Sequence, residues 1–470
     1  MSWLDRDRTI APPGFNRWLI PPAALAVHLC IGQAYATSVY KTALVEHFDA
    51  SLTQIGVIFS IAIVMLGLSA AIMGTWVDTQ GPRKAMFVAA LFWSGGFLVG
   101  SLGIFNNQLW LVYLGYGVIG GIGLGIGYIS PVSTLIKWFP DRPGLATGMA
   151  IMGFGGGALI ASPVSTALLG FYDPNSGAAE WVASGDAVGK LFLTLGVLYL
   201  VYMMFGAFTI KVPAPGWKPA GFDPSTIKVK ALVTNNHVSA KNAIRTRQFW
   251  LVWIVLFCNV TAGIGILEQA APMIQDFFRQ GDGTSLVTAA VASGFVGLLS
   301  IANMGGRFAW SATSDKTGRK NIYMMYLGAG TVLYLLLALF GGSSTALYVV
   351  LAFVIISFYG GGFATVPAYL RDLFGTFQVG AIHGRLLTAW SAAGIAGPLI
   401  VNAFLDAQGT PGELTAAAYQ PALLTMVGLL VIGFIANLFV KPVHTDYHEP
   451  DTALSASAAS RATKLIGDRK

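Results

Sequence analysis

One arginine of the chain lies inside an apolar stretch, where a charged side chain is costly. The segment NMGGRFAWSATSDKTGRK (303–320) places Arg307 eight residues before Asp315, which is about 12 Å along a helix. Half of a bilayer's hydrocarbon core is about 15 Å thick, so Arg307 is expected near the middle of a membrane, at a cost of about 2.5–3.5 kcal/mol. A structural ion pair would explain it, but no acidic residue lies within two helical turns. Because a guanidinium matches a carboxylate bidentately and stays charged, we interpret Arg307 as an anion-binding residue.

Other polar side chains are expected at a similar depth. Asn303 precedes Arg307 by one turn and shares its helix face. It could bind the anion, hold the arginine in place, or simply hydrogen-bond between helices. In the first part of the chain, the polar candidates for an opposite wall are Gln33, Tyr35 and Tyr128. For these three, substrate contact and ordinary helix packing are both open interpretations.

The composition indicates that membrane helices position these residues. The chain is 55% apolar and only 10% charged, whereas soluble domains are roughly 25% charged. Crossing the hydrocarbon core takes about 20 residues of helix, and twelve apolar segments are long enough to do so. They fall near 18–42, 53–77, 85–105, 109–138, 143–170, 189–210, 249–274, 285–312, 321–341, 345–369, 379–404 and 420–440. We therefore predict an all-α integral membrane protein with twelve transmembrane helices.

The basic residues predict how these helices are oriented. If successive loops alternate between the two sides of the membrane, one side holds 23 of the 28 Lys and Arg residues, including those of both termini. The other side holds Lys41, Lys190 and Arg279. Since cytoplasmic loops carry the excess of Lys and Arg, both termini are predicted to be cytoplasmic, in a multi-pass protein of the plasma membrane.

Two halves of the chain repeat each other. GTWVDTQGPRK (74–84) closes the second apolar segment, and WSATSDKTGRK (310–320) closes the eighth. Gly148 follows Pro131 by 17 residues, and Gly384 follows Pro367 by the same 17. Three pairs share an offset of 237: Asp78 with Asp315, Gly81 with Gly318, and Arg83 with Lys320.

This duplication predicts two six-helix repeats. The predicted parts are an N-terminal half at 1–210, a basic cytoplasmic linker at 211–247, a C-terminal half at 248–440 and a cytoplasmic tail at 441–470. At the position of Arg307, the first repeat has Ala70. Arg307 therefore departs from the duplicated scaffold.

The duplicated turn resembles motif A of the major facilitator superfamily, a resemblance that covers nearly the whole chain. GIGYISPVSTLIKWFPDRPGLATGMAIMGFGGGA (125–158) and GQAYATSVY (32–40) are similar to the oxalate/formate antiporter group, a relative of the monocarboxylate transporters. The resemblance implies the major facilitator fold and a carboxylate-binding arginine on the eighth helix. It also implies a gating role near the cytoplasmic mouth for Gly74, Asp78, Gly81, Arg83, Asp315, Gly318 and Arg319.

One departure from this group bears on the cargo. Oxalate-exchanging members place a lysine on the eleventh helix facing the eighth-helix arginine, and by spacing this position is Trp390. With a single cation, a monoanion leaves the site neutral, whereas a dianion brings an unpaired charge that costs several kcal/mol. The sequence therefore favours a monocarboxylate such as lactate, pyruvate or formate, with Trp390 as an apolar wall. An oxalate:formate antiporter is the alternative.

Other functional classes fit less well. A drug or cation exporter of the same fold would use carboxylates near the middle of the membrane, and none lies there. The loops hold no paired carboxylates, metal cluster or nucleophile constellation, so we expect neither an enzyme nor a metal or cofactor site. The basic residues behind the net charge of +7 are concentrated on one side of the membrane, which argues against a nucleic-acid partner. His28 could carry a co-transported proton or serve only in packing. The transporter is expected to function as a monomer.

Overall fold

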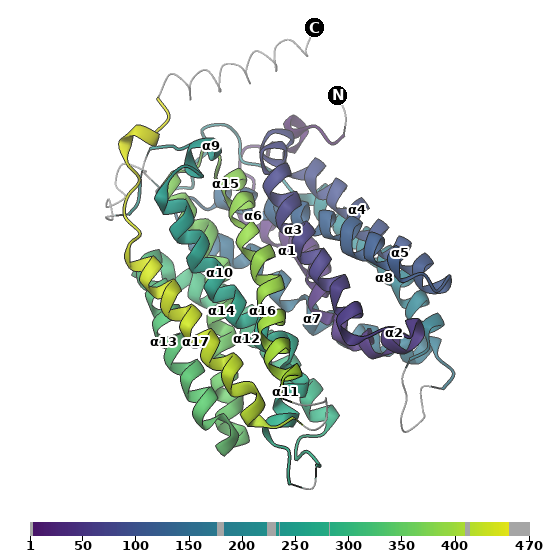
Figure 1. Ribbon diagram of the computed structural model, residues 1–470. Helices are drawn as coiled ribbons and strands as arrows, with labels where there is room; N and C mark the ends of the chain where they lie inside the picture. Colours follow the sequence, from purple (N-terminus) through teal and green to yellow (C-terminus); the bar gives the residue numbers. More distant parts are fainter. Residues whose placement is uncertain are drawn as a thin grey trace.

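The computed structural model describes residues 3–175, 183–222, 232–234, 236–281, 283–408 and 414–450. These residues form a bundle of long helices (Figure 1). Residues 223–231 and 235 of the predicted linker and residues 451–470 of the predicted tail lie outside the described residues.

The first half of the chain supplies six long helical segments, several of them built from consecutive helices. The second half of the first segment is a 3-10 helix, and the fourth contains a π-helix, a local widening that is frequent at functional sites. The elements are η1 (Arg6–Thr9), η2 (Arg17–Leu19), α1 (Ile20–Ile31), η3 (Gly32–Tyr40), α2 (Lys41–Phe48), α3 (Leu52–Gln80), α4 (Pro82–Phe105), α5 (Leu109–Val112), η4 (Tyr113–Gly120, the π-helix), α6 (Gly121–Trp138), α7 (Pro143–Tyr172) and α8 (Gly185–Thr209).

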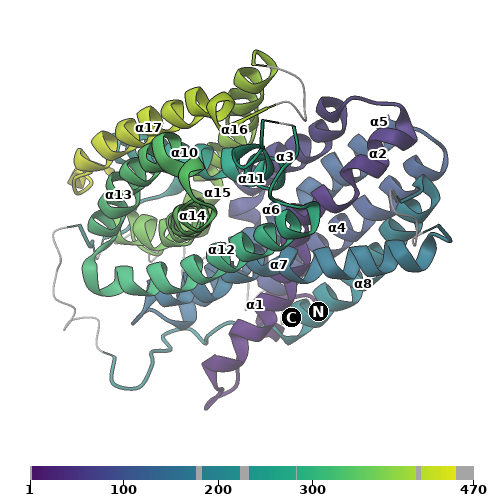
Figure 2. The ribbon, with the colours of Figure 1, turned by 90° about the horizontal axis from the view of Figure 1, so that it is seen from below.

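The second half repeats this arrangement. Its elements are α9 (Ala240–Ala243), α10 (Arg247–Glu268), α11 (Ala270–Phe277), α12 (Ala289–Thr317), α13 (Arg319–Phe340), η6 (Gly341–Ser343), α14 (Thr345–Phe374), α15 (Val379–Leu386), α16 (Thr388–Asp406), α17 (Ala416–Leu438) and η7 (Thr445–Tyr447). Figure 2 shows the two halves side by side when the bundle is viewed along its length.

Eleven helical segments of the described residues are long and apolar enough to cross a membrane. The 29-residue helix α12 is not among them, and it carries Asn303, Arg307 and several small polar residues that lower its hydropathy. It packs against both α14 and α7, which are among the eleven. With α12 the described residues contain twelve long helical segments, as the sequence predicts.

The bundle has two distinct ends. The first described residues and the last ones, near residue 450, lie at one end, which we call the termini face (Figure 1). The helices α2 and α11 lie at the opposite end, which we call the cavity face. The turns α3–α4 and α12–α13 lie at the termini face, and each passes through a glycine with φ of +89°, Gly81 and Gly318, a conformation that costs glycine little.

Three helix pairs form most of the boundary between the halves. α7 of the first half packs against α12 of the second, and α3 packs against α15 and α16. A Cβ at Gly148 would lie 2.9 Å from the carbonyl oxygen of Arg307. A Cβ at Gly384 would overlap the carbonyl oxygen of Ala70. Because Ala70 and Arg307 are 237 residues apart, the same close approach occurs at repeat-related positions. The close contacts at the boundary are therefore duplicated, whereas the first repeat has no counterpart of the Arg307 side chain.

Candidate anion-binding site

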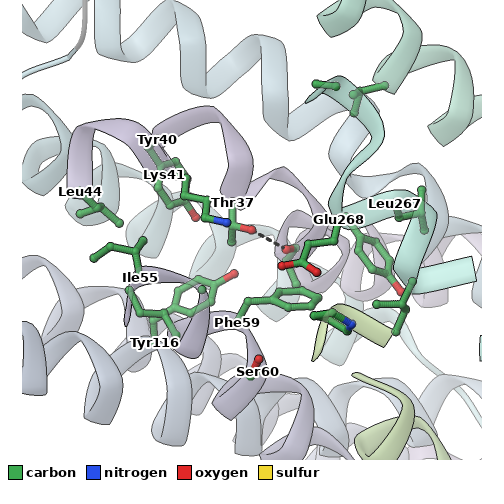
Figure 3. Close-up of a pocket in the computed structure, with 18 of the residues that line it drawn as sticks. Thr37, Tyr40, Lys41, Leu44, Ile55, Phe59, Ser60, Tyr116, Leu267 and Glu268 are labelled. Carbon is green, nitrogen blue, oxygen red and sulfur yellow. Dashed lines mark hydrogen bonds between the residues drawn. The ribbon is translucent and has the colours of Figure 1, made fainter. Parts of the chain in front are cut away.

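A cavity opens between the halves toward the cavity face (Figure 3). It offers about 170 Å³ of space to the centres of water-sized molecules. Its walls are mostly apolar and come from both halves, with Phe59 on one side and Ile264 on the other. Lys41 and Glu268 also line it and face each other across the mouth. The cavity is wide enough for a small organic molecule.

The floor of the cavity lies between the two halves. Tyr35, Gly155 and Asn303 line it, and the hydroxyl of Tyr35 lies 3.0 Å from that of Tyr359 on α14. A Cβ at Gly155 would lie 2.8 Å from Nε of Arg307. The guanidinium of Arg307 is therefore directly behind this floor, and a glycine is what allows it to lie so close.

Arg307 is fully buried, with 0% of its surface exposed. Its Nε donates to Oδ1 of Asn303 at 2.9 Å, and its Nη1 donates to the carbonyl of Ile151 on α7 at 3.4 Å. Its Nη2 has no hydrogen-bond partner within the described residues. The guanidinium carbon lies 5.5 Å and 5.0 Å from the ring centroids of Phe154 and Phe363. The site thus combines a buried cation, a free donor and aromatic walls.

Tyr128 and Trp390 complete the aromatic walls. The ring of Trp390 lies 5.6 Å from that of Tyr128, 5.3 Å from that of Phe154 and 4.3 Å from that of Phe363. Both side chains are fully buried, and neither the Tyr128 hydroxyl nor Nε1 of Trp390 has a hydrogen-bond partner within the described residues. Since buried donors normally find a partner, these two can serve an anion held by Arg307.

The remaining predicted site residues lie in two environments. His28 is buried and stacks on Tyr128 at 5.3 Å between ring centroids, with its Nε2 3.1 Å from the Tyr128 carbonyl oxygen. Gln33 points away from this cluster: its Nε2 donates to the hydroxyl of Tyr40 at 2.8 Å, and its Oε1 accepts from Tyr116 at 3.1 Å. The structure therefore brings His28, but not Gln33, to Arg307 and its aromatic walls.

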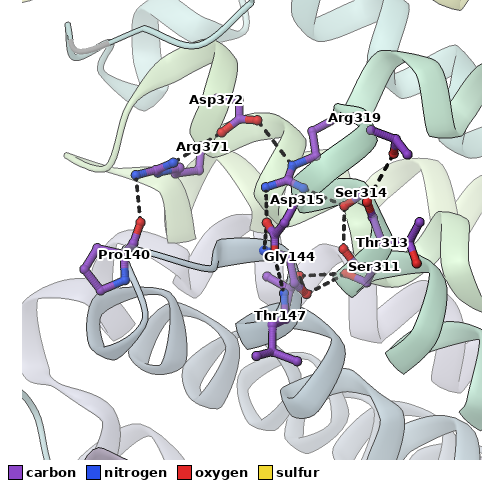
Figure 4. A network of polar contacts seen from close by, with 12 residues as sticks. Pro140, Gly144, Thr147, Ser311, Thr313, Ser314, Asp315, Arg319, Arg371 and Asp372 are labelled. Carbon is purple, nitrogen blue, oxygen red and sulfur yellow. Dashed lines mark hydrogen bonds and ion pairs between the residues drawn. The ribbon is translucent and has the colours of Figure 1, made fainter. Parts of the chain in front are cut away.

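The predicted gating residues meet the opposite half at the termini face. Asp315 on α12 accepts from the backbone N–H groups of Gly144 and Leu145, at the start of α7, at 2.9 and 3.0 Å (Figure 4). Asp78 on α3 accepts from Ala381 N–H, in the first turn of α15, at 3.2 Å. A carboxylate at a helix N-terminus is favourable because free N–H groups and the helix dipole attract it. Both acidic residues thus hold the termini face closed.

The other gating residues support these two contacts. Arg319 lies 2.6 Å from Asp315 and 3.2 Å from Asp372 on α14, while Arg371 donates to the Pro140 carbonyl of the first half (Figure 4). Arg83 donates to the carbonyl oxygens of Trp3 and Phe208 within its own half. At Gly74, a Cβ would lie 2.9 Å from Cα of Ala381. The two halves are therefore in close contact at the termini face, opposite the opening of the cavity.

Sequence reasoning did not single out four residues of this cluster. They are Phe154, Tyr359, Phe363 and His383. The signal was present in that Phe154 and Phe363 flank glycine runs, GFGGGA and GGGFA, and such runs let helices approach closely. With 29 Phe and 16 Tyr in the chain, the aromatic residues alone did not distinguish the site.

The chain is similar to a known protein family and to several named proteins. The family model described as Major Facilitator Superfamily matches residues 23–398. The oxalate:formate antiporter of Oxalobacter formigenes is 26% identical over 385 residues, which cover 81% of this chain and 83% of that protein. Apicoplast pyruvate carrier 1 of Toxoplasma gondii is 26% identical over 390 residues, covering 74% and 69%. Human monocarboxylate transporter 11 is 25% identical over 288 residues, covering 61% and 55%.

Solved structures share the fold. The transporter FucP in its outward conformation has a TM-score of 0.62 and 16% identity, covering 91% of this chain and 100% of that one. A bacterial homologue of the human lysosomal transporter Spinster, in an inward-facing conformation, has a TM-score of 0.59 and 17% identity, covering 92% and 97%. At this identity the likeness concerns the fold alone.

Proposed function

Because this chain belongs to the major facilitator superfamily, we propose that it is a secondary active transporter of small monocarboxylate anions. Relatives named as an oxalate:formate antiporter, a pyruvate carrier and a monocarboxylate transporter support a carboxylate cargo. Binding sites of secondary transporters lie near the membrane midplane between repeats, which is where Arg307 is expected. These relatives are named as an antiporter, a carrier and a transporter. We assign no catalytic reaction to the chain.

The observation that carries the proposal is the buried guanidinium of Arg307, whose Nη2 has no hydrogen-bond partner within the described residues. Within the described residues, no carboxylate lies in ion-pair distance of it. A buried charge without a counter-charge is costly, and a carboxylate entering from the cavity would supply both the charge and a hydrogen-bond acceptor. The anion would pass Tyr35 and Asn303 at the cavity floor to reach Nη2.

Transport then follows from rocking of the halves. The cavity face would close over the bound anion, and the termini face would open as Asp78 and Asp315 leave the helix N-termini that they contact. Without the anion, the buried charge of Arg307 makes the intermediate, in which both faces are closed, unfavourable. This gives the anion a direct role in permitting the change of conformation.

The size and charge of the cargo follow from the walls around Arg307. Trp390 and Phe363 present apolar rings, which suit the methyl end of lactate or pyruvate, and the single cation suits a single negative charge. A second candidate is oxalate:formate exchange, favoured by the similarity to the Oxalobacter formigenes antiporter. A need for an internal counter-anion during uptake would distinguish exchange from symport with a proton, for which His28 is our candidate carrier.

Substituting Arg307 tests the proposal. In proteoliposomes that contain the purified protein, we expect labelled lactate or pyruvate to accumulate, and Arg307→Lys to reduce uptake at least ~10-fold, because an ammonium lacks the bidentate fork. Arg142→Lys, whose side chain is 63% exposed, is the matched control. Near-normal uptake by Arg307→Lys would show that this arginine does not bind the carboxylate.

Substituting Trp390 tests the cargo. We expect Trp390→Lys to raise the potency of oxalate as a competitor of labelled lactate, because a second cation would then face a dianion. Unmodified protein that exchanges oxalate tightly and ignores lactate and pyruvate would overturn the monocarboxylate assignment. Arg385, whose Nη1 has no partner within the described residues, would then be the next cation to examine.

We further propose that the protein lies in the plasma membrane with both termini in the cytoplasm, and that one chain suffices for transport. The cavity and Arg307 are formed within a single chain. Reporter fusions after residues 220 and 450 should both be active in the cytoplasm. Activity outside the cell at either position would contradict this orientation.

A further inference from the structure

Five buried polar atoms without hydrogen-bond partners within the described residues belong to residues around the ring of Tyr128 and the neighbouring rings of Phe154 and Phe363. Three belong to residues of the proposed anion site, one to His28, the candidate proton carrier, and one to His383, which has no role so far. The atoms are Nη2 of Arg307, the hydroxyl of Tyr128, Nε1 of Trp390, Nδ1 of His28 and Nε2 of His383. An unpaired buried polar group costs about 1–3 kcal/mol, so a cluster of five indicates a place that is occupied during function.

The two histidines approach Tyr128 from opposite halves. His28 on α1 stacks on the ring, and its Nε2 donates to the Tyr128 carbonyl, so its position is fixed within the first half. His383 on α15 belongs to the second half, and its ring centroid lies 5.8 Å from that of Tyr128. It is 2% exposed. His383 is therefore the histidine with a ring nitrogen available on the C-terminal side of the cluster.

We propose that His383 is a conditional second cation of the anion site. When its imidazole is neutral, Arg307 alone balances the cargo and the site takes a monocarboxylate. When its imidazole is protonated, two cations face the site and it takes a dicarboxylate such as oxalate. The proposal rests on the proposed function of Arg307 as the carboxylate-binding residue and adds a second, pH-dependent class of substrate.

The proton balance is simple. Nε2 of His383 takes one proton from hydronium in the bulk solution, and the new N–H donates to the second carboxylate. The cluster then holds two positive and two negative charges. Because a buried charge without a counter-charge is costly, the proton and the dianion enter together, and each raises the affinity for the other.

The charged groups around His383 leave the counter-charge of its protonated imidazole to be supplied by a ligand. Besides Tyr128, the titratable group that approaches it across the boundary is His28, which contacts the same Tyr128 ring. Asp78 on α3 lies against Gly380, about one turn before His383, but it is occupied by Ala381 N–H and Lys137.

The remaining neighbours of α15 are also accounted for. On α14, Arg371 and Asp372 pair with each other. On α9, Lys241 is the one charged residue, and α15 itself carries Arg385. None of the described carboxylates lies in ion-pair distance of His383. A carboxylate on the ligand would therefore be its counter-charge.

Competition in proteoliposomes tests the proposal. Labelled pyruvate uptake is measured with unlabelled oxalate or unlabelled lactate as competitor, at about pH 7.5 and about pH 5.5, where histidine changes charge. The readout is the ratio of oxalate potency to lactate potency. It is measured in the unmodified protein, His383→Gln, His383→Lys, His28→Gln and His47→Gln. His47 serves as the matched control because it lies on α2, where its ring contacts Phe48 and the Ile104 carbonyl.

We expect the ratio in the unmodified protein to rise as the pH falls, by up to about tenfold per pH unit for one linked proton. His383→Gln should lose this rise, whereas His47→Gln should keep it. His383→Lys should give a high ratio already at pH 7.5, which a merely structural role for His383 would not produce.

A ratio that is flat in the unmodified protein, or that still rises in His383→Gln, overturns the proposal, as does a rise lost in His28→Gln alone. Each of these results presupposes pyruvate uptake by the unmodified protein. Failure of the proposed function would instead appear as the absence of that uptake at either pH, so the two failures are distinguishable.

Discussion

Arg307 uses two of its three guanidinium nitrogens in hydrogen bonds within the described residues. Asn303 and the Ile151 carbonyl take Nε and Nη1, and the latter contact is long at 3.4 Å. These contacts come from both halves, since Asn303 lies on α12 and Ile151 on α7. The guanidinium is therefore held in place while Nη2 stays available, which is the arrangement that a preorganised anion site requires.

Asn303 offers a sharp test of this arrangement. We expect Asn303→Asp to abolish carboxylate uptake, because the new carboxylate would pair with Arg307 and compete with the anion. The purified variant should be at least as resistant to heat as the unmodified protein, since a buried charge gains a partner. Asn303→Ala should instead leave Nε unpaired, at a cost of about 1–3 kcal/mol, and lower stability. Normal uptake by Asn303→Asp would contradict the assigned role of Arg307.

The sequence predicts that Arg307 and Asn303 lie together, because their relationship is local. A spacing of four residues places two side chains on one helix face, and the structure shows them hydrogen-bonded. The environment of Gln33 is harder to predict from the sequence. Whether its amide faces a cavity or hydrogen-bonds to neighbouring side chains depends on Tyr40 and Tyr116. Tyr116 lies in a different helix that approaches Gln33 only in the folded bundle. Contacts of this kind leave no pattern in a single sequence.

At the level of helices, the duplication is visible as two matched close approaches. Gly148 lets α7 approach α12 at Arg307, and Gly384 lets α15 approach α3 at Ala70. Asp315 and Asp78 contact the first turns of α7 and α15 in the same way. The spacing of these residues in the sequence predicts two repeats, and the structure adds that the repeated residues form the boundary between the halves.

The membrane-spanning helices were predictable because a long apolar segment is a strong signal for such a helix. Their boundaries agree with the predicted segments, with α4 (Pro82–Phe105) against 85–105 as one example. The short helices α2 and α11 and the π-helix η4 were not predicted. They interrupt or extend apolar segments without any change in composition, so hydropathy does not reveal them.

Gly384 tests the contact between α3 and α15. We expect Gly384→Ala to weaken closure of the termini face, because the added methyl would overlap the Ala70 carbonyl. The measurement is the labelling rate of a cysteine introduced at Ala146, which is fully buried in the first turn of α7. This rate should increase severalfold in the Gly384→Ala background. Gly428→Ala on α17 is the matched control, since nothing lies within 4 Å of its Cβ position. Equal labelling in the two backgrounds would show that this glycine does not control closure.

On the scale of the whole molecule, the structure is closed at one face and open at the other. Contacts between the halves hold the termini face, where Asp315 meets α7, Asp78 meets α15 and Ser311 donates to the Gly144 carbonyl at 2.7 Å. The cavity separates the halves at the opposite face. Alternating access requires the reverse arrangement, so residues on opposite walls of the cavity must be able to meet.

Lys41 and Glu268 are suited to this role. They lie on opposite halves, line the cavity and face each other across its mouth (Figure 3), yet they are not within ion-pair distance in the open state, because no ion pair joins them within the described residues. Oε2 of Glu268 is also buried without a partner within the described residues. Closure of the cavity face would bring these opposite charges together.

Charge reversal tests this role. We expect Lys41→Glu and Glu268→Lys each to slow uptake severalfold, because two like charges would resist closure. The double exchange should recover much of the loss, since it restores an attractive pair in the opposite order. Uptake by the four proteins forms a double-mutant cycle that isolates the interaction between the two side chains. Lys190→Glu is the matched control, because Lys190 pairs with Asp186 on α8 and does not line the cavity. If the double exchange is no faster than the slower single variant, the two residues do not meet during transport, and closure of the cavity face must depend on its apolar walls.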